Sequence, residues 1–202
     1  MIAYENKIKL FAANFQGKKI LDVGCGNGNY TAYFAHDNNT IYGVDINDFR
    51  QKRFSDKFKF KKYPGKKLPF KDNFFDLVVS FDVIEHVEDD LLFVNEIYRV
   101  LKKNGAVYLA TPNRNRLSNV LMRLVGKPVK YPYVLSTGGR LGEVIHLREY
   151  LGEELRQILK ISKFYNIELE PFWFGLRGGV NRGVNRPLFK SLAQYLFVKA
   201  EK

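Results

Sequence analysis

Three glycines alternate with other residues in the segment LDVGCGNGNY, residues 21–30, directly after a short apolar run. Glycine is the costliest residue to order and adds nothing to a core, so this spacing indicates a backbone turn that passes close to a ligand. A strand, a glycine loop and a helix bind a nucleotide cofactor when an acidic residue ends the next strand. Asp45 ends the segment IYGVD and is expected to accept hydrogen bonds from ribose hydroxyls.

The spacing within the loop differs from that of a dinucleotide fingerprint. In G-x-G-x-x-G the helix N-terminus faces a pyrophosphate, but here Asn29 stands where the third glycine would fall. Asp22 comes just before the loop, and a carboxylate beside a phosphate would be unfavourable. It suits a positive charge, such as an amino group or a sulfonium. The sequence therefore predicts a nucleoside that carries a cationic tail.

A second group of reactive residues lies in the segment FDVIEHVED. Asp82, Glu85 and His86 have i, i+3, i+4 spacing, so on a helix they share one face, and His146 could fold over the same strand ends. Two acids and two histidines can chelate a divalent metal, or the histidines can simply hydrogen-bond within the fold. His146 is either a general base or substrate anchor, or an ordinary residue near a helix N-terminus. His36 is expected to be structural.

The elements that must position these residues alternate along the chain. Segments of helical period and short apolar segments follow one another, which predicts an α/β, doubly wound, mostly parallel sheet covered by helices. The expected strands are residues 20–23, 40–45, 58–62, 77–81, 106–111, 164–170 and 193–202. The expected helices are residues 4–15, a helix that begins in the glycine loop and carries Tyr30, Tyr33 and Phe34 inward, a helix over 91–101 that a left-handed Gly105 ends, and 148–162.

Regular patterning lapses between residues 113 and 145. So long a connection inside a compact domain is usually a lid or a substrate-binding insertion, and we expect a single domain over residues 1–202 that carries it. Residues 170–187 gather Phe172, Trp173 and Phe174 beside glycines and arginines. These aromatic residues either pack under a hairpin, which we favour, or touch a membrane or stack on nucleic acid.

The composition narrows the class of protein. The chain has 202 residues and 46% hydrophobic residues, which fits a folded globule, and its formal net charge is +12. Cys25 is the only cysteine, which excludes an intrachain disulfide and a cysteine zinc cage. We find no secretory signal and no apolar stretch of the roughly 20 residues that cross a bilayer, and expect a cytoplasmic protein. The positive charge would attract an anionic partner, or is an ordinary solvated surface.

Four segments in order, LDVGCGNGNY, IYGVD, LPFKDNFFDLVVSFDVIEHVED and LKKNGAVYLATPN, resemble the motifs of class I S-adenosylmethionine-dependent methyltransferases. The type-11 group, which includes the ubiquinone-pathway O-methyltransferases, is the most similar. The resemblance implies a Rossmann-like, seven-stranded, mostly parallel sheet whose last strand is antiparallel, and S-adenosylmethionine as cofactor. The residues it places at the cofactor are Asp22, Gly24, Cys25, Gly26 and Gly28 along the loop, Asp45 at the ribose, Ile46 on the adenine and Phe81 near the transferred methyl.

The sequence departs from the family at one position of the cofactor site. The family often has an acidic residue shortly before LPF that contacts the adenine amine, whereas this chain reads KKYPGKKLPF. That contact must come from the backbone near Pro64 or Gly65, or be absent.

The resemblance also implies the reaction. We expect methyl transfer to a small molecule that could be anionic, at oxygen, with His146 and His86 as the catalytic residues. Similar metal-binding sets occur in metal-dependent ubiquinone-pathway enzymes and in small-RNA 3′-end methyltransferases, where glutamate replaces Asp82, so a divalent metal stays an alternative and no metal ligand is assigned. The alternative functions are an RNA methyltransferase that uses the basic surface and a non-catalytic, cofactor-binding partner subunit; the intact glycine loop and Asp45 disfavour the latter.

Overall fold

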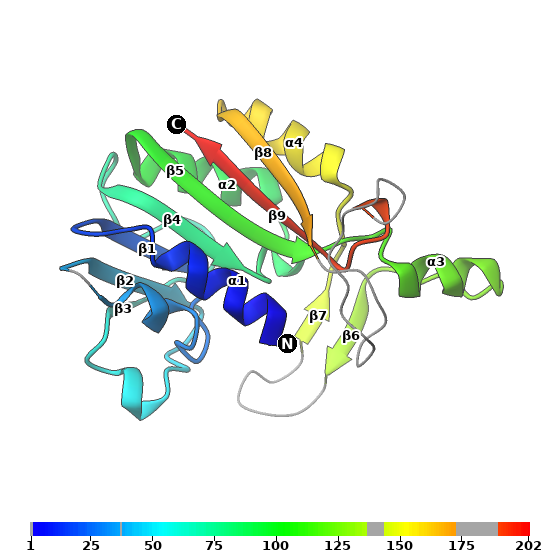
Figure 1. Ribbon diagram of the computed structural model, residues 1–202, viewed down its shortest axis with the longest axis horizontal. Helices are drawn as coiled ribbons and strands as arrows, with labels where there is room; N and C mark the ends of the chain where they lie inside the picture. The colour runs from blue at the N-terminus through cyan, green and yellow to red at the C-terminus, as the bar shows by residue number, and fades with distance from the viewer. Residues whose placement is uncertain (1, 37, 137–143, 173–189) are drawn as a thin grey trace.

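A computed structural model describes residues 2–36, 38–136, 144–172 and 190–202. Its centre is a seven-stranded sheet with the strand order β3-β2-β1-β4-β5-β9-β8 (Figure 1). The strands are β1 (Lys19–Val23), β2 (Thr40–Asp45), β3 (Lys59–Lys62), β4 (Phe75–Phe81), β5 (Leu101–Pro112), β8 (Tyr165–Phe172) and β9 (Tyr195–Glu201). From β3 to β5 the neighbours run parallel, and β9 runs antiparallel to both β5 and β8. The predicted doubly wound sheet with an antiparallel last strand is confirmed.

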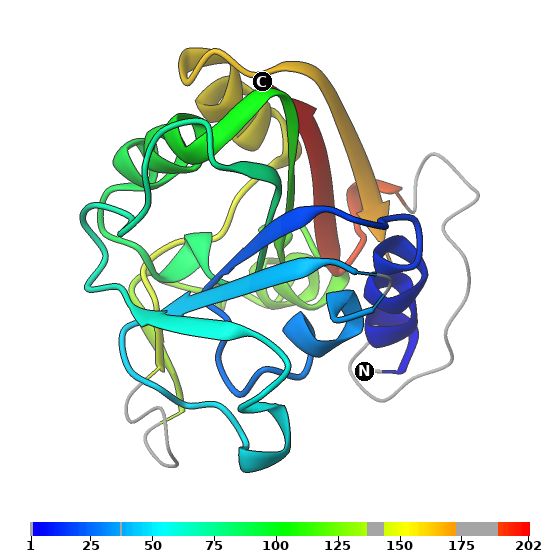
Figure 2. The ribbon, with the colours of Figure 1, turned by 90° about the vertical axis from the view of Figure 1, so that its left-hand side faces the viewer.

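Helices cover both faces of this sheet. Helix α1 (Ile2–Ala12) lies on one face, and α2 (Asp90–Val100) and α4 (Gly152–Ile161) lie on the other (Figures 1 and 2). Each face has its own apolar core: Tyr4 and Ile8 of α1 pack with one cluster, and Ile97 of α2 and Leu155 of α4 with the other. The apolar residues of α1 recur at helical spacing, so one stripe of the helix faces the sheet. Because β1, β2 and β4 are parallel neighbours, their carboxyl ends lie together at one end of the sheet.

The helix predicted after the glycine loop is wrong in its type. Residues Thr31–Phe34 form a single 3₁₀ turn, η1, and the chain then returns to β2. Helix α1 occupies this face of the sheet, and the rings of Phe11 and Phe15 lie 6.4 and 6.5 Å from the ring of Phe34. A longer helix would compete with α1 for the same apolar surface, so one turn suffices to bury Phe34.

The third predicted helix ends within one residue of its expected end, but the residue predicted to end it is wrong. Helix α2 stops at Val100, and the residues of LKKNG already belong to β5. The left-handed residue is Asn104, with φ +63°, rather than Gly105. Gly105 serves a different purpose, because a β-carbon there would lie 2.9 Å from the Lys102 carbonyl oxygen and 3.2 Å from that of Asp76. It allows β4 and β5 to approach where their register shifts.

The irregular segment after β5 forms three elements. Helix α3 (Leu117–Leu124) projects from the body, and β6 (Tyr133–Ser136) pairs antiparallel with β7 (Val144–His146) (Figure 1). In this pairing Tyr133 stands opposite His146. The expected aromatic cluster at 172–174 lies, beyond Phe172, outside the described residues. Within the described ranges, no helix is both long and apolar enough to cross a membrane.

Candidate functional site

The glycine loop follows β1 and bends back over the end of β2. The backbone amides of Gly24 and Cys25 both donate to the carbonyl oxygen of Val44, at 2.8 and 3.0 Å. Gly24 has φ +81°, and a β-carbon there would lie 2.2 Å from Cγ2 of Val83. Any other residue would therefore strain the backbone and clash with the chain after β4. The loop presents bare main chain at the carboxyl ends of three adjacent strands.

Asp45 lies at the end of β2 and is fixed by this loop. Its Oδ2 accepts from the amide of Gly26 at 2.8 Å, and its Oδ1 accepts from the amide of Ile46 at 2.7 Å. Burial raises the pKa of Asp45, while these two amides oppose the shift. Each carboxylate oxygen can accept a further bond, so Asp45 can still take two hydroxyl donors. Next to it, the side chain of Ile46 is 54% exposed, unusual for isoleucine and open to a planar ligand.

Three other predicted cofactor residues are buried around the loop. Asp22 is 2% exposed and accepts from the hydroxyl of Thr31 at 2.6 Å, and burial raises the pKa of Asp22 to about 7. Cys25 is buried, and this burial raises the pKa of its thiol, so the group is unreactive. Phe81 ends β4 and packs edge-on against the ring of Tyr30, 5.8 Å away. The structure thus gathers them below the surface of the loop rather than on it.

Gly28 completes the loop, with φ +86° beside the ring of Phe58. On the other side of Asp45, the amide of Tyr63 donates to the Asp45 carbonyl oxygen at 2.7 Å. The segment with Pro64 and Gly65 therefore starts at the same strand end as Asp45, and both residues are exposed.

The second reactive group follows β4. The expected helical face of Asp82, Glu85 and His86 does not form, because Asp82 has φ +56° and only Ile84–His86 make a 3₁₀ turn, η3. Asp82 Oδ1 and Glu85 Oε1 are nevertheless both buried and have no hydrogen-bond partner, while Glu85 Oε2 accepts from the hydroxyl of Thr111 at 2.8 Å. Burial raises the pKa of both carboxyls, and the charge of Asp82 raises that of Glu85 further. Unpartnered carboxylate oxygens at this depth call for a proton or a cation.

The two histidines meet above these acids. The rings of His86 and His146 lie 4.8 Å apart, and His86 Nε2 is 3.9 Å from Glu85 Oε1. His86 Nδ1 lies 2.6 Å from the carbonyl oxygen of Ile145, which fixes the proton on Nδ1 and leaves a lone pair on Nε2. Burial, followed by the neighbouring His146, lowers the pKa of His86. His86 is therefore a neutral base at pH 7.

His146 is held by residues that sequence reasoning missed. Its Nδ1 is 2.9 Å from the hydroxyl of Tyr133 and 3.3 Å from Oε1 of Glu149. Glu149 also bonds Arg116 at 2.6 Å and the side-chain amide of Asn119 at 2.9 Å. Burial opposes ionisation of Glu149, but the bond from His146 and the charge of Arg116 hold its pKa below the usual value. Glu149 thus stays an anion that orients His146 and ties α3 and β6 to it.

One further residue, Tyr4, reaches this region from α1. Burial raises the pKa of the Tyr4 phenol, and the charge and hydrogen bonding of the neighbouring Asp82 carboxylate raise it further. The sequence offered no signal for this contact beyond a helical stripe. His36, by contrast, lies away from the site, with its Nε2 3.1 Å from the carbonyl oxygen of Ala12.

The donor atoms at this position suit a divalent cation. Glu85, His86 and His146 each offer one ligand atom, and these atoms all lie within 4.8 Å of one another. The orphaned Glu85 Oε1 and two imidazoles with fixed Nδ1 partners are the features that an imidazole and carboxylate site requires. Asp82, which the sequence placed first in the set, is not one of these three residues.

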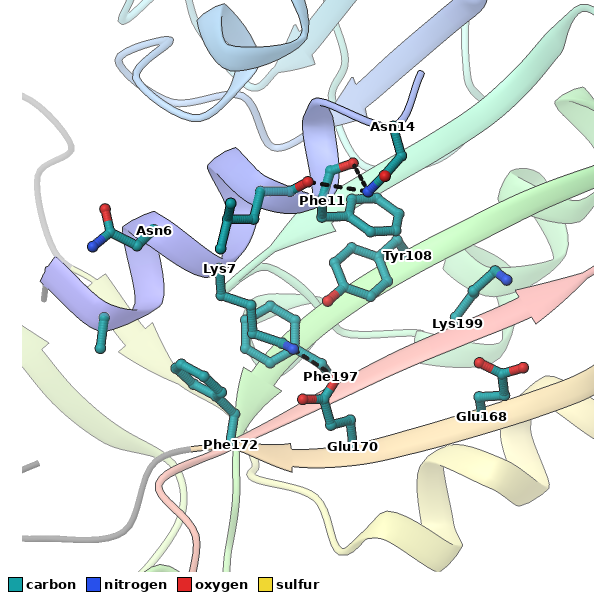
Figure 3. Close-up of a pocket in the computed structure, with 12 residues that line it drawn as sticks. Asn6, Lys7, Phe11, Asn14, Tyr108, Glu168, Glu170, Phe172, Phe197 and Lys199 are labelled. Atoms are coloured by element: carbon teal, nitrogen blue, oxygen red, sulfur yellow. Dashed lines mark hydrogen bonds and ion pairs between the residues drawn. The ribbon is translucent and has the colours of Figure 1, made fainter. Parts of the chain in front are cut away.

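A groove on the α1 face is separate from both groups. It has a volume of about 560 Å³ and lies between α1 and strands β5, β9 and β8 (Figure 3). Lys7 lies against the aromatic residues that line the groove. Its Nζ is 5.1 Å from the ring centres of Phe172 and Phe197 and forms an ion pair with Glu170 at 2.6 Å. None of the residues that line it belongs to the glycine loop or to the cluster of acids and histidines.

Comparison with known sequences finds a family whose model matches part of this chain. Residues 21–109 match the family described as "Methyltransferase domain". The chain is 41% identical over 116 residues to an uncharacterized protein of Methanocaldococcus jannaschii, covering 55% of this chain and 49% of that one. It is 30% identical over 134 residues to a ubiquinone biosynthesis O-methyltransferase of Pelagibacter ubique, covering 60% and 55%. The chain spans about half the length of the curated relatives it matches.

Solved structures share the fold over nearly the whole chain. A SAM dependent methyltransferase from Archaeoglobus fulgidus aligns with a TM-score of 0.69 at 18% identity, covering 99% of this chain and 93% of that one. A 1,6-didemethyltoxoflavin-N1-methyltransferase from Burkholderia thailandensis, with bound S-adenosylhomocysteine, gives 0.61 at 18% identity, covering 98% and 77%. The [4+2]-cyclase SpnF gives 0.66 at 17% identity, covering 99% and 80%. The fold therefore serves more than one chemistry, and the side chains must decide the reaction.

Proposed function

We propose that this chain, which through residues 21–109 is a class I S-adenosylmethionine-dependent methyltransferase of the type-11 group, transfers a methyl group to a hydroxyl of a small molecule. One observation carries the proposal. The glycine loop with Asp45, and the buried cluster of Glu85, His86 and His146, lie at the same ends of the sheet strands. A cofactor on the former would present its methyl group towards the latter.

The cofactor half of the proposal follows from the loop. Asp45, fixed by two backbone amides, would accept the ribose hydroxyls, and the exposed side chain of Ile46 would pack on the adenine. The bare backbone at Gly24 and Gly26 would lie against the methionine portion of the cofactor. Cys25, Gly28 and Phe81 would form the surrounding wall of the site. Asp22, buried beneath the loop, would lie near the cationic end, and a positive charge there favours its ionised form.

The reaction itself is an in-line displacement. An acceptor oxygen attacks the methyl carbon, the carbon–sulfur bond breaks, the electron pair returns to sulfur as a neutral thioether, and the hydroxyl proton passes to a base. His146 suits this last role, because its Nδ1 side is held by Glu149 and its Nε2 can accept the proton. The anionic Glu149 then stabilises the imidazolium. His86, neutral and with a free Nε2, is the second base within reach.

A divalent cation fits the same side chains. Glu85, His86 and His146 would hold it, and when bound it would lower the pKa of an acceptor hydroxyl as a Lewis acid. The protein's own part is unchanged in that case: it excludes water from Glu85 and fixes both rings through Ile145 and Glu149.

The insertion at residues 113–145 supports a small acceptor. We propose that the chain is a single domain and that the part of this insertion which the structure describes, α3 and β6, covers the site, since Tyr133 on β6 supports the ring of His146. An O-methyltransferase is among the named relatives, which fits a hydroxyl acceptor. RNA is the second candidate acceptor, because the formal net charge of +12 would attract a polyanion.

The test is methyl transfer from a labelled donor into fractionated cell extract. We expect label in the small-metabolite fraction with the wild-type chain and none with Asp45→Ala, which removes the ribose contact. Label in RNA alone would replace the small-molecule acceptor with the second candidate.

Two further measurements test the metal and the cofactor. Repeating the reaction with chelator, and then with added Mg²⁺ or Mn²⁺, shows whether Glu85, His86 and His146 work with a metal. Calorimetry with S-adenosylhomocysteine is the independent check, and absence of binding would refute the cofactor assignment.

A further inference from the structure

Helix α3 turns its apolar side away from the protein. Its one buried residue is Asn119, whose side-chain amide donates to Glu149 Oε2 at 2.9 Å and to the Arg114 carbonyl oxygen at 3.1 Å. At 3.6 residues per turn, Leu121 and Leu124 point about 140° to 160° away from Asn119. A surface helix normally buries its apolar stripe and exposes its polar one. In α3 the polar residue anchors the helix, and the leucines face outward.

Four exposed apolar residues lie on this helix or directly after it. Leu121 is 42% exposed, Met122 40%, Leu124 77% and Val125 66%. None of them belongs to either apolar core of the described residues. Because α3 projects from the body (Figure 1), these side chains form an accessible apolar end rather than scattered single residues.

The charge around α3 has a single sign. Residues 113–142 contain no aspartate or glutamate, and their basic residues are Arg114, Arg116, Arg123, Lys127, Lys130 and Arg140. Arg114 and Arg116 are used inside the fold, by Glu154 and Glu149. Arg123, Lys127 and Lys130 form no ion pair with an acidic residue of the described ranges, and all three are exposed. An outward apolar face with unpaired cations at its end is the chemistry of a helix that lies in the interface of an anionic membrane.

We propose that the α3 surface, defined as Leu121, Leu124, Val125, Lys127 and Lys130, binds the enzyme to membranes that contain anionic lipid. The leucines enter the acyl boundary and the lysines remain at the phosphates. The surface fits other partners less well. RNA binding uses aromatic stacking, and the five residues that define the α3 surface include no Phe, Tyr or Trp. A second copy of the chain would bring the same unpaired lysines against one another. This attachment does not depend on the methyl acceptor.

Vesicle flotation tests the proposal. The wild-type chain is mixed with vesicles of phosphatidylcholine and phosphatidylglycerol in equal parts, or of phosphatidylcholine alone. We expect binding to the anionic vesicles only, weakening as salt is raised. Lys127→Glu with Lys130→Glu should reduce partitioning by about 25-fold or more, since each basic residue near an anionic surface contributes about fivefold. Leu121→Ser with Leu124→Ser should reduce it at least about tenfold.

Matched control variants separate the α3 surface from general stickiness and general charge. Ile161→Ser removes an apolar side chain that is 65% exposed on α4, and Lys57→Glu with Lys66→Glu reverses two exposed lysines elsewhere. Both controls should float like the wild type. Thermal melting and S-adenosylhomocysteine binding confirm that every variant is folded. As a gain-of-signal variant, Leu124→Trp in a Trp173→Phe background should shift its fluorescence to shorter wavelength when anionic vesicles are added.

Several results would overturn the proposal. These are no flotation of the wild-type chain, equal flotation of the α3 and control variants, or a tryptophan signal that vesicles leave unchanged. A dimer in size-exclusion chromatography that Leu121→Ser with Leu124→Ser dissociates would assign the surface to a second copy. RNA binding that Lys127→Glu with Lys130→Glu abolishes, in a chain that ignores vesicles, would assign it to nucleic acid.

Discussion

The cofactor half of the proposed site is built from main-chain groups, whereas the acceptor half is built from side chains. The cofactor half is main chain: amides of the loop after β1 donate to Val44 and Asp45 at the end of β2, so its contacts join residues next to two adjacent strands. The acceptor half is side chain: His146 is positioned by Tyr133 and Glu149 across the insertion. The first half should tolerate most side-chain changes but few changes of backbone, and the second should fail when one side chain is lost.

The largest expected effect comes from removing the hub of the acceptor half. Glu149→Ala leaves Arg116, whose side chain is only 17% exposed, without its anion and frees His146 to rotate. Breaking a buried pair from one side costs about 3 to 5 kcal/mol of stability. We expect that loss in urea unfolding, together with loss of methyl transfer. Affinity for S-adenosylhomocysteine, measured by calorimetry in the folded protein, should be unchanged.

Two variants control this prediction. Glu149→Gln keeps the shape and most hydrogen bonds but removes the charge, so it should recover stability more than activity. Glu153→Ala removes an exposed carboxylate from the same part of the chain and should change neither. If Glu149→Ala weakens the cofactor as much as it weakens activity, the two halves are not independent.

The second effect concerns the cofactor half. Gly24→Ala places a β-carbon 2.2 Å from Val83 at φ +81°, so it combines backbone strain with overpacking. The left-handed conformation costs about 1 to 2 kcal/mol and the crowding about 1 to 3. We expect a loss of about 2 to 5 kcal/mol, shared between stability and cofactor affinity, in urea unfolding and calorimetry.

Gly17→Ala is the matched control for Gly24→Ala. Gly17 has φ +62°, but a β-carbon there would meet nothing within 4 Å. It should therefore show only the backbone cost and no loss of cofactor affinity. If both variants behave alike, the close approach of the loop to Val83 has no part in the site.

The same contrast explains what the sequence could predict. The strands, the glycine loop and Asp45 follow from local sequence patterns. A loop that binds through its main chain needs particular residues at consecutive positions, and these can be recognised in the sequence. The spacing would put Asp82, Glu85 and His86 on one face only if they formed a helix, and no helix forms there, because Asp82 adopts φ +56° between β4 and η3. Its close contact with Tyr4, 78 positions earlier, depends on how α1 packs on the sheet.

The partners of His146 were missed for a similar reason. Tyr133 contacts His146 because β6 and β7 pair antiparallel. This segment has no sequence periodicity from which that pairing could be predicted. Glu149 follows His146 by three residues, a spacing that is common by chance, and its role becomes visible only when Arg116 and Asn119 converge on it. Long-range side-chain contacts are where single-sequence reasoning stops.

A smaller effect is expected at the ribose. Asp45→Ala removes a carboxylate that the amides of Gly26 and Ile46 hold in place, and with it the charge-assisted hydrogen bonding proposed for the ribose. Affinity for S-adenosylhomocysteine should fall by about 1.5 to 3 kcal/mol, measured by calorimetry. Asp48→Ala, which removes an exposed carboxylate paired with Arg50, is the control and should leave the affinity unchanged. An unaltered affinity in Asp45→Ala would move the ribose elsewhere.

The smallest effect sharpens the comparison, because it tests a side chain within the main-chain half. Burial raises the pKa of Asp22 to about 7, so in the empty protein about half of the molecules carry a proton there at pH 7. A bound cation favours the ionised form, so S-adenosylmethionine should expel that proton. Calorimetry in buffers of different ionisation heat should record up to about half a proton released at pH 7, worth only about 0.4 kcal/mol. Affinity for S-adenosylmethionine should rise as pH increases towards 7 and level off above it.

Two controls isolate the charge. The Asp22→Asn variant should release no proton on binding, and neither should the wild-type chain on binding methylthioadenosine, which lacks the cationic tail. Equal release with methylthioadenosine would mean that Asp22 responds to the nucleoside and not to the charge it was expected to face.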